Sequence, residues 1–185
     1  MTFTESNLKF DFSAFETAEQ YDSLDNQCAG LKIVDFVAED SDRQYFIEVK
    51  NYANTSVDPL IQTAMDIRRQ TDYRMLTDPA AAFPLEMGMK FKDSILRWLA
   101  AGGDFYKPIA LLLVINPHEA MKPKARLKLI KRISGYIPAG MNIAPERYPR
   151  MNTLFFDMPT VKEVGELYGI NVTVRALTSP NGGAD

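Results

Sequence analysis

The sequence predicts an α/β domain in which helices flank a mixed central sheet. Three observations favour this fold class. Residues 31–51 read as a β-hairpin, Lys90–Ala101 has the apolar spacing of an amphipathic helix, and Pro108–Asn116 is an apolar run without polar alternation. Such a run is typical of a central strand that is covered on both faces and paired in parallel. A hairpin, then helices, then a buried strand is the order expected of a mixed sheet.

Length and composition limit the alternatives. A chain of 185 residues is the size of one domain, so we expect residues 1–177 to form it and the polar tail 178–185 to be disordered. The single cysteine, Cys28, excludes an internal disulfide and fits a reducing cytoplasm. No apolar run approaches the roughly 18 residues of a membrane span, and the first residues lack a signal-peptide pattern. We therefore expect a cytoplasmic protein that makes no membrane contact.

The N-terminal part predicts one strand and one helix. Asn7–Phe12 alternates polar and apolar residues, as a short strand does. Ser13–Asp25 is expected to be helical, because Ser13 and Glu16 have the spacing of a capping box.

The hairpin follows from two segments rich in β-branched and aromatic residues, Leu31–Ala38 and Gln44–Asn51. A charged turn at residues 39–43 joins them. With Ser41 and Asp42 at the tip, position 40 pairs with 43 and position 38 with 45. Asp35 then lies directly opposite Glu48. A turn one residue longer or shorter would send one of the two carboxylates to the other face.

Three charged residues inside the hairpin indicate chemistry. Side-chain alternation puts Glu48 and Lys50 on one face of their strand. Directly opposed residues have Cβ atoms about 4.5–5.5 Å apart, which suits Asp35 and Glu48 sharing one divalent ion. Burying these charges among apolar residues is costly without partners. Mg²⁺ prefers oxygen ligands, and Lys50 could position a water or stabilise developing negative charge. The pattern thus favours a site that hydrolyses phosphodiesters.

The later elements complete the sheet and add a basic surface. Gly102-Gly103 should end the helix at Lys90–Ala101. Lys122–Arg132 predicts a helix anchored by Leu127, Ile130 and Ile133. Its basic residues are either a solvated face or contacts to nucleic-acid phosphates. The residues that we assign to those contacts are Lys124, Arg126, Lys128 and Lys131.

The C-terminal part predicts a β-α-β unit. Thr153–Met158 and Ile170–Leu177 read as strands, with a helix at Pro159–Tyr168 between them. We expect this unit to extend the central sheet.

Asp35, followed after twelve residues by Glu48-Val49-Lys50 on the next strand, resembles the PD-(D/E)XK nucleases, whose fold is restriction-endonuclease-like. This is the chain's only Asp/Glu-x-Lys triplet. The resemblance implies an αβββαβ core and a nuclease dependent on Mg²⁺ or Mn²⁺, acting as an endonuclease or exonuclease. Asp35 and Glu48 would be metal ligands and Lys50 the catalytic lysine. Val34 stands where the family usually has proline.

The resemblance also implies a third acidic residue, because the first helix of the family often supplies a glutamate near the metal. The capping box already explains Glu16, so Glu19 is the residue we assign as a metal ligand. The expected partner is nucleic acid, DNA before RNA, with a homodimer or a protein partner left open. Two alternatives stand beside the nuclease. One is a non-catalytic binding or regulatory module on the same fold, and the other is an unrelated α/β domain with the triad on an ordinary surface.

Overall fold

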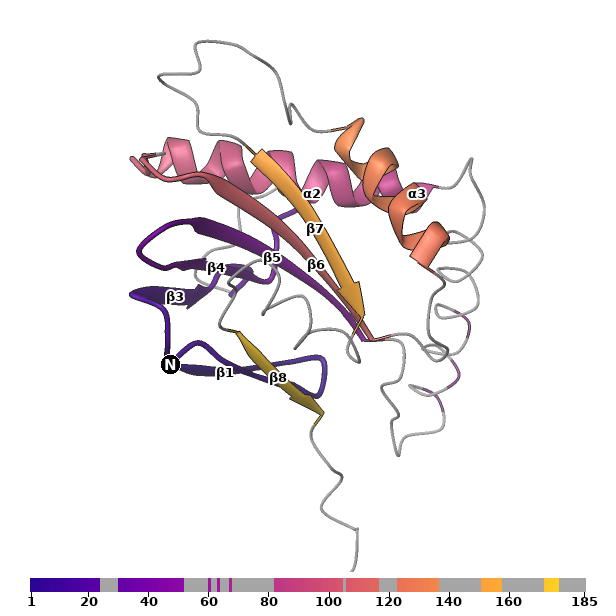
Figure 1. Cartoon of the computed structure of the whole chain (residues 1–185), viewed down its shortest axis with the longest axis horizontal. Helices are drawn as coiled ribbons and strands as arrows, with labels where there is room; N and C mark the ends of the chain where they lie inside the picture. The colour runs from indigo at the N-terminus through magenta and orange to yellow at the C-terminus, as the bar shows by residue number, and fades with distance from the viewer. Residues whose placement is uncertain are drawn as a thin grey trace, which may run out of the picture.

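A computed structural model describes residues 1–23, 30–51, 60, 63, 67, 82–104, 106–116, 123–136, 151–157 and 172–176 (Figure 1). The fold is mixed α/β, with two sheets and a layer of helices. The larger sheet lies in the middle of the molecule. The small sheet covers one of its faces, and helices cover the other.

Within the described residues, the central sheet has five strands in the order β3-β4-β5-β6-β7. Strands β3 (Thr17–Gln20), β4 (Phe36–Glu39) and β5 (Gln44–Asn51) form an antiparallel meander. Strand β6 (Ile109–Asn116) pairs in parallel with β5, and β7 (Met151–Asp157) pairs in parallel with β6. The predicted mixed sheet is therefore confirmed. So is the prediction that the apolar run at 108–116 is a central parallel strand.

Strand β6 is buried on both faces, as its composition requires. Leu111 and Leu113 belong to the core on the helix side, whereas Leu112 and Val114 belong to the core on the side of the small sheet. Each of these four side chains has at most 1% of its surface exposed. Apolar residues at every position are needed here because neither face of the strand meets solvent.

The second sheet has three strands in the part of the chain that the structure describes, in the order β1-β2-β8. Strands β1 (Thr2–Glu5) and β2 (Leu8–Asp11) form a hairpin whose tip, Ser6-Asn7, has positive φ at both residues, as a type I′ turn does. Strand β8 (Thr173–Ala176) pairs antiparallel with β2. The prediction that the second strand of the C-terminal unit extends the central sheet is therefore wrong.

The physical reason is the apolar inner face of β2. Leu8 and Phe10 are fully buried against the central sheet, and Val172 and Val174, in and just before β8, join the same cluster. By pairing with β2, the strand buries its valines in a core that already exists. The predicted helix at Pro159–Tyr168 and the tail at 178–185 lie outside the described residues.

Helix α2 (Ala82–Ala100) packs across the other face of the central sheet. Its buried side chains recur at intervals of four residues; they are Phe83, Met87, Phe91 and Ile95. It ends where predicted, since Gly102 has positive φ and the Gly103 N–H donates to the Trp98 carbonyl. It begins at Ala82, eight residues before the predicted Lys90. Pro84 does not prevent this earlier start, because proline is tolerated within the first turn of a helix.

Helix α3 (Pro123–Ser134) contacts α2 and β7. Ile133 is buried as predicted, but Leu127 is 60% exposed and does not anchor the helix. None of the helices in the described ranges is long and apolar enough to cross a lipid bilayer.

The predicted helix at Ser13–Asp25 is wrong over its described part, residues 13–23. Instead of closing a capping box, Glu16 donates its N–H to the Glu39 carbonyl, and β3 then pairs with β4. Phe15 meets the Tyr45 ring edge-on, with the ring centroids 5.3 Å apart. Sheet pairing with β4 and this aromatic contact override a local helix signal, because tertiary burial outweighs propensity over a short segment.

Candidate active site

The β4–β5 hairpin has the predicted register. Phe36 pairs with Ile47 and Ala38 with Tyr45, and the Asp40 N–H donates to the Arg43 carbonyl over 3.0 Å. Asp35, directly before β4, therefore lies opposite Glu48. The parity on which the site depends is confirmed.

The turn keeps this register because one side chain organises it. The Asp40 carboxylate accepts the N–H groups of Asp42 and Arg43 over 2.9 and 2.8 Å, and the hydroxyl of Tyr45 over 2.6 Å. An aspartate that binds backbone N–H groups two and three residues ahead is a common way to close a turn.

Asp35 and Glu48 are both buried on the face that α2 covers. Glu48 is completely inaccessible to solvent, and Asp35 is 5% exposed. One oxygen of Asp35, Oδ2, accepts the Val49 N–H over 2.6 Å. Burial raises the pKa of the Asp35 carboxyl well above its usual value, and the nearby Glu48 charge raises it further. Two carboxylates held this way need positive charge close by.

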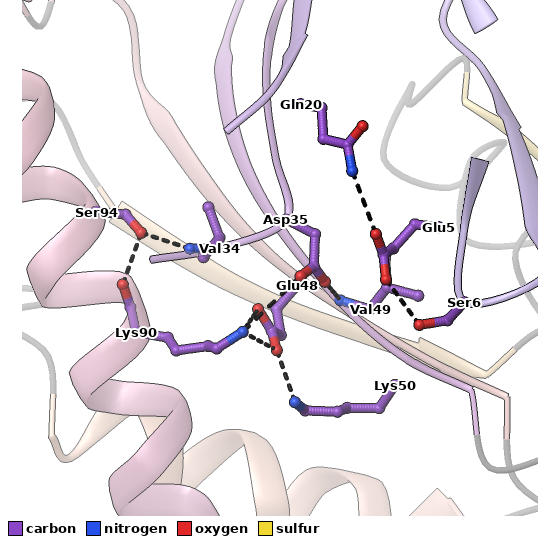
Figure 2. A network of polar contacts seen from close by, with 10 residues as sticks. All are labelled: Glu5, Ser6, Gln20, Val34, Asp35, Glu48, Val49, Lys50, Lys90 and Ser94. Carbon is purple, nitrogen blue, oxygen red and sulfur yellow. Dashed lines mark hydrogen bonds and ion pairs between the residues drawn. The ribbon is translucent and has the colours of Figure 1, made fainter. Parts of the chain in front are cut away.

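Two lysines supply it, and together the four side chains form what we call the buried charge quartet: Asp35, Glu48, Lys50 and Lys90 (Figure 2). The Lys50 Nζ lies 2.9 Å from Glu48 Oε1. The Lys90 Nζ lies 2.7 and 2.8 Å from the two Glu48 oxygens and 3.8 Å from Asp35 Oδ1. Two carboxylates thus meet two ammonium groups, and the quartet is electrically balanced.

Lys90 is the functional candidate that the sequence did not reveal. Burial alone would lower the pKa of its ammonium, but the Glu48 and Asp35 charges outweigh burial, and the pKa is raised. The spacing of residues along α2 could have indicated Lys90. Once α2 is extended to Ala82, Lys90 and Ser94 continue the spacing of Phe83 and Met87 on the face toward the sheet. Polar residues on such a face need partners inside the protein.

Helix α2 is held at this place by the segment that carries Asp35. The Val34 N–H donates to the Ser94 hydroxyl over 2.8 Å, and that hydroxyl donates to the Lys90 carbonyl over 2.7 Å (Figure 2). The Lys32 N–H donates to Asp93 over 3.0 Å. A proline at position 34 has no N–H to donate. The valine in place of the expected proline is therefore part of how this chain positions Lys90.

The β1–β2 turn lies beside the quartet. Glu5 accepts the Ser6 hydroxyl over 2.7 Å, and the Asn51 amide donates to the Ser6 carbonyl over 2.6 Å, which ties the turn to the end of β5. The Glu5 charge adds slightly to the raised pKa of Asp35. Figure 2 shows Glu5 between Gln20 and this turn, on the side of Asp35 away from Lys90.

The structure does not bring Glu19 to the quartet. Glu19 is an exposed residue of edge strand β3, opposite Val37, and it does not come from a helix. Within the described ranges, no group of three or more His, Cys, Asp or Glu side chains is arranged to hold a metal ion. As candidate metal ligands, the described part of the chain therefore offers the two carboxylates of Asp35 and Glu48.

The predicted phosphate-contacting residues lie on α3. Three of them, Lys124, Lys128 and Lys131, are exposed, whereas the structure does not describe the side chain of Arg126. These lysines are free to meet an external polyanion. Their contact with nucleic acid stays a prediction.

The residues of the quartet fit a divalent cation in their chemistry. Mg²⁺ is commonly bound by one or two carboxylates, with water and substrate phosphates completing its shell. Asp35 and Glu48 provide such a pair. Burial first and the Glu48 charge second raise the pKa of Asp35, and a cation between the two carboxylates would offset both effects. Lys90 holds both oxygens of Glu48, so a cation there has to replace its contacts.

Comparison with known proteins finds no relative, because no family model matches the sequence and neither a curated protein nor a solved structure matches the chain. What the site can do is therefore inferred from its own geometry.

Proposed function

We propose that this protein is a metal-dependent nuclease of the PD-(D/E)XK type, which hydrolyses phosphodiester bonds of DNA or RNA. The observation that carries the proposal is the opposed pair of buried carboxylates, Asp35 and Glu48, with Lys50 ion-paired to Glu48 on the same strand. Buried charge of this kind destabilises an ordinary hairpin and is typical of functional sites.

The order of elements supports the same assignment. The β3-β4-β5 meander, then α2, then a strand parallel to β5 reproduce the βββαβ part of the αβββαβ core. Asp35 precedes the second strand of the meander, and Glu48 and Lys50 lie on the third. The described residues do not supply the first helix of that core.

Asp35 and Glu48 would hold Mg²⁺ or Mn²⁺, which supplies a Lewis acid for a phosphoryl oxygen and lowers the pKa of a bound water. Lys50 keeps 11% of its side chain accessible, whereas Glu48, with which it pairs, is fully buried. Its ammonium can donate to a phosphate oxygen as negative charge develops there.

Substrate binding is assigned to α3. The chain has a net charge of −3, so attraction to a nucleic-acid backbone has to be local. Lys124, Lys128 and Lys131 offer three exposed positive charges on one helix, and Arg126 belongs to the same predicted set. We favour DNA over RNA as substrate and the cytoplasm as the place of action.

The test is a titration followed by a cleavage assay. Mn²⁺ and Mg²⁺ are titrated calorimetrically into wild type, Asp35→Ala and Lys92→Ala, and the proteins are then incubated with labelled DNA and RNA. Lys92 is an exposed lysine of α2 and serves as the matched control. We expect metal binding to be lost in Asp35→Ala and kept in Lys92→Ala. Metal-dependent cleavage should disappear in Lys50→Ala.

A second candidate is a non-catalytic binding or regulatory module on the same fold. Its supporting observation is the charge balance of the quartet, in which Lys90 compensates Glu48 without any ion. This candidate predicts a folded protein that binds no metal and cleaves neither DNA nor RNA. Failure of wild type to bind Mn²⁺ in the titration would select it.

A further inference from the structure

The Lys90 ammonium lies where a cation between Asp35 and Glu48 would lie. It touches both Glu48 oxygens and faces Asp35 Oδ1, whereas Lys50 contacts only Glu48 Oε1. Lys90 comes from α2, so no strand pairing fixes its ammonium. Its side chain is 17% exposed, so the end of a long, flexible lysine lies between the carboxylates and solvent.

Asp22 is a second candidate acceptor for the same ammonium, because its charge acts on Lys90. Asp22 follows Tyr21, whose N–H donates to the backbone carbonyl of Asp35 over 2.7 Å, so Asp22 is next in the chain to a residue that pairs with Asp35. Asp22 Oδ1 is buried and accepts no hydrogen bond from any part of the chain that the structure describes. The charge of Asp22 also favours the protonated form of Lys90. A buried carboxylate oxygen without a partner is costly, and a buried atom of that kind calls for a functional explanation.

We propose that Lys90 is a displaceable cation with two positions. In the metal-free protein its ammonium neutralises Glu48 and Asp35. A divalent cation binds that pair by moving the ammonium to Asp22 Oδ1. This inference deepens the proposed nuclease site and rests on the metal binding assigned there, but it does not require cleavage.

The consequence is a competition between two cations for one pair of carboxylates. The apparent metal affinity equals the intrinsic affinity multiplied by the fraction of molecules in which Lys90 has left the site. Asp22 lowers the cost of moving Lys90 and so favours the metal-bound arrangement. Removing Lys90 and removing the negative charge of Asp22 should therefore change the metal affinity in opposite directions.

The first experiment measures the Mn²⁺ dissociation constant, without nucleic acid, for wild type and five variants. Lys90→Met should bind Mn²⁺ about tenfold more tightly or better, within the usual range of coupling between two competing ligands. Asp22→Asn should bind about fivefold more weakly. The double variant should match Lys90→Met, because Asp22 acts only through Lys90. Lys92→Met and Asp42→Asn, which change exposed residues, should leave the constant unchanged.

The second experiment observes the ammonium of Lys90 in the wild-type protein, and it uses variants only to assign the signal and as a control. Nuclear magnetic resonance of the lysine ammonium groups should show one slowly exchanging signal for Lys90, assigned by its loss in Lys90→Arg. That signal should shift on addition of diamagnetic Mg²⁺ in wild type and should not shift in Asp35→Asn.

The outcomes separate this inference from the proposed function. Equal Mn²⁺ constants in wild type, Lys90→Met and Asp22→Asn, or a Lys90 signal that ignores saturating Mg²⁺, would overturn the displacement while leaving a nuclease intact. Opposite shifts in affinity without any cleavage of DNA or RNA would support the displacement and remove the nuclease. Failure of every variant to bind Mn²⁺ would overturn both.

Discussion

The two ends of the β4–β5 hairpin satisfy their carboxylates in different ways. At the turn, Asp40 accepts two backbone N–H groups and a tyrosine hydroxyl, all from residues within five positions of it. At the other end, Glu48 is met by Lys90, which is 42 residues away in the sequence. The neutral local donors fix a turn and belong to the backbone that they stabilise. The ammonium compensates a charge and can be exchanged for another cation. The hydrogen bonds of Asp40 stabilise the turn, whereas the ammonium at Glu48 leaves a place that another cation can take.

The largest expected effect on stability comes from a substitution at Glu48. Glu48→Gln removes the charge that Lys50 and Lys90 share, and breaking a buried ion pair from one side costs about 3–5 kcal/mol. Because both lysines keep some exposure, we expect the free energy of unfolding to fall by about 3 kcal/mol, the low end of that range. Urea denaturation at pH 7 measures it. Glu16→Gln, in an exposed pair with Lys107, is the control and should have no measurable effect. Equal losses of unfolding free energy in Glu48→Gln and Glu16→Gln would contradict the claim that the buried ion pairs stabilise the fold more than the exposed pair does.

The next effect concerns the contact that positions Lys90. Ser94→Ala leaves the buried Val34 N–H without its acceptor, which costs about 1–3 kcal/mol. The same denaturation measures it, with the exposed Ser41→Ala as control. We also expect the Lys90 ammonium signal to exchange faster with water, because its helix turn is held less firmly. An unchanged signal would show that Ser94 does not position Lys90.

At the turn, Asp40→Ala removes the carboxylate that accepts three hydrogen bonds. We expect a loss of about 1–2 kcal/mol of unfolding free energy, since such bonds each contribute about 1 kcal/mol and water replaces some of them. The Mn²⁺ dissociation constant should stay within about twofold of wild type, because no charge of the quartet changes. A metal affinity that falls together with stability would show that the two ends are coupled.

The smallest effect is confined to alkaline pH. Burial, followed by the hydrogen bond to Asp40, raises the pKa of the Tyr45 hydroxyl above its usual 10.0. The folded protein therefore keeps a proton that the unfolded chain loses. The stability it contributes is fully present below pH 10 and is lost as the pH rises from 10 toward the raised pKa. Tyr45→Phe should lack this decline. Urea midpoints at pH 8, 9, 10 and 11 would show the two proteins converging, and parallel curves would contradict the assignment.

How much of the fold the sequence could predict depends on the range of the interactions involved. The hairpin register and the opposition of Asp35 and Glu48 follow from alternation within a short segment, and the structure confirms both. The central parallel strand follows from its uninterrupted apolar composition. The helix expected at Ser13–Asp25 failed because its capping signal is weaker than pairing with β4.

For the residues of the candidate site, too, what the sequence could predict depends on the range of the interactions. Asp35, Glu48 and Lys50 could be found from the sequence, because they share a hairpin face whose geometry is local. Lys90 could not be found before the true start of α2 was known, and the orphaned oxygen of Asp22 is visible only in the packed structure. Glu19 was assigned by resemblance to a helix that the described residues do not contain.

The sequence by itself determined where two carboxylates meet across a hairpin, since strand pairing has a period of two and the turn has one compatible length. The tertiary structure decided what neutralises them. A buried charge has to be compensated by the nearest available opposite charge, whatever its distance along the chain. Lys50 supplies one such charge from the same strand as Glu48. The other is Lys90, which is placed by the packing of α2 and by the Val34 N–H and which no local pattern around Glu48 encodes.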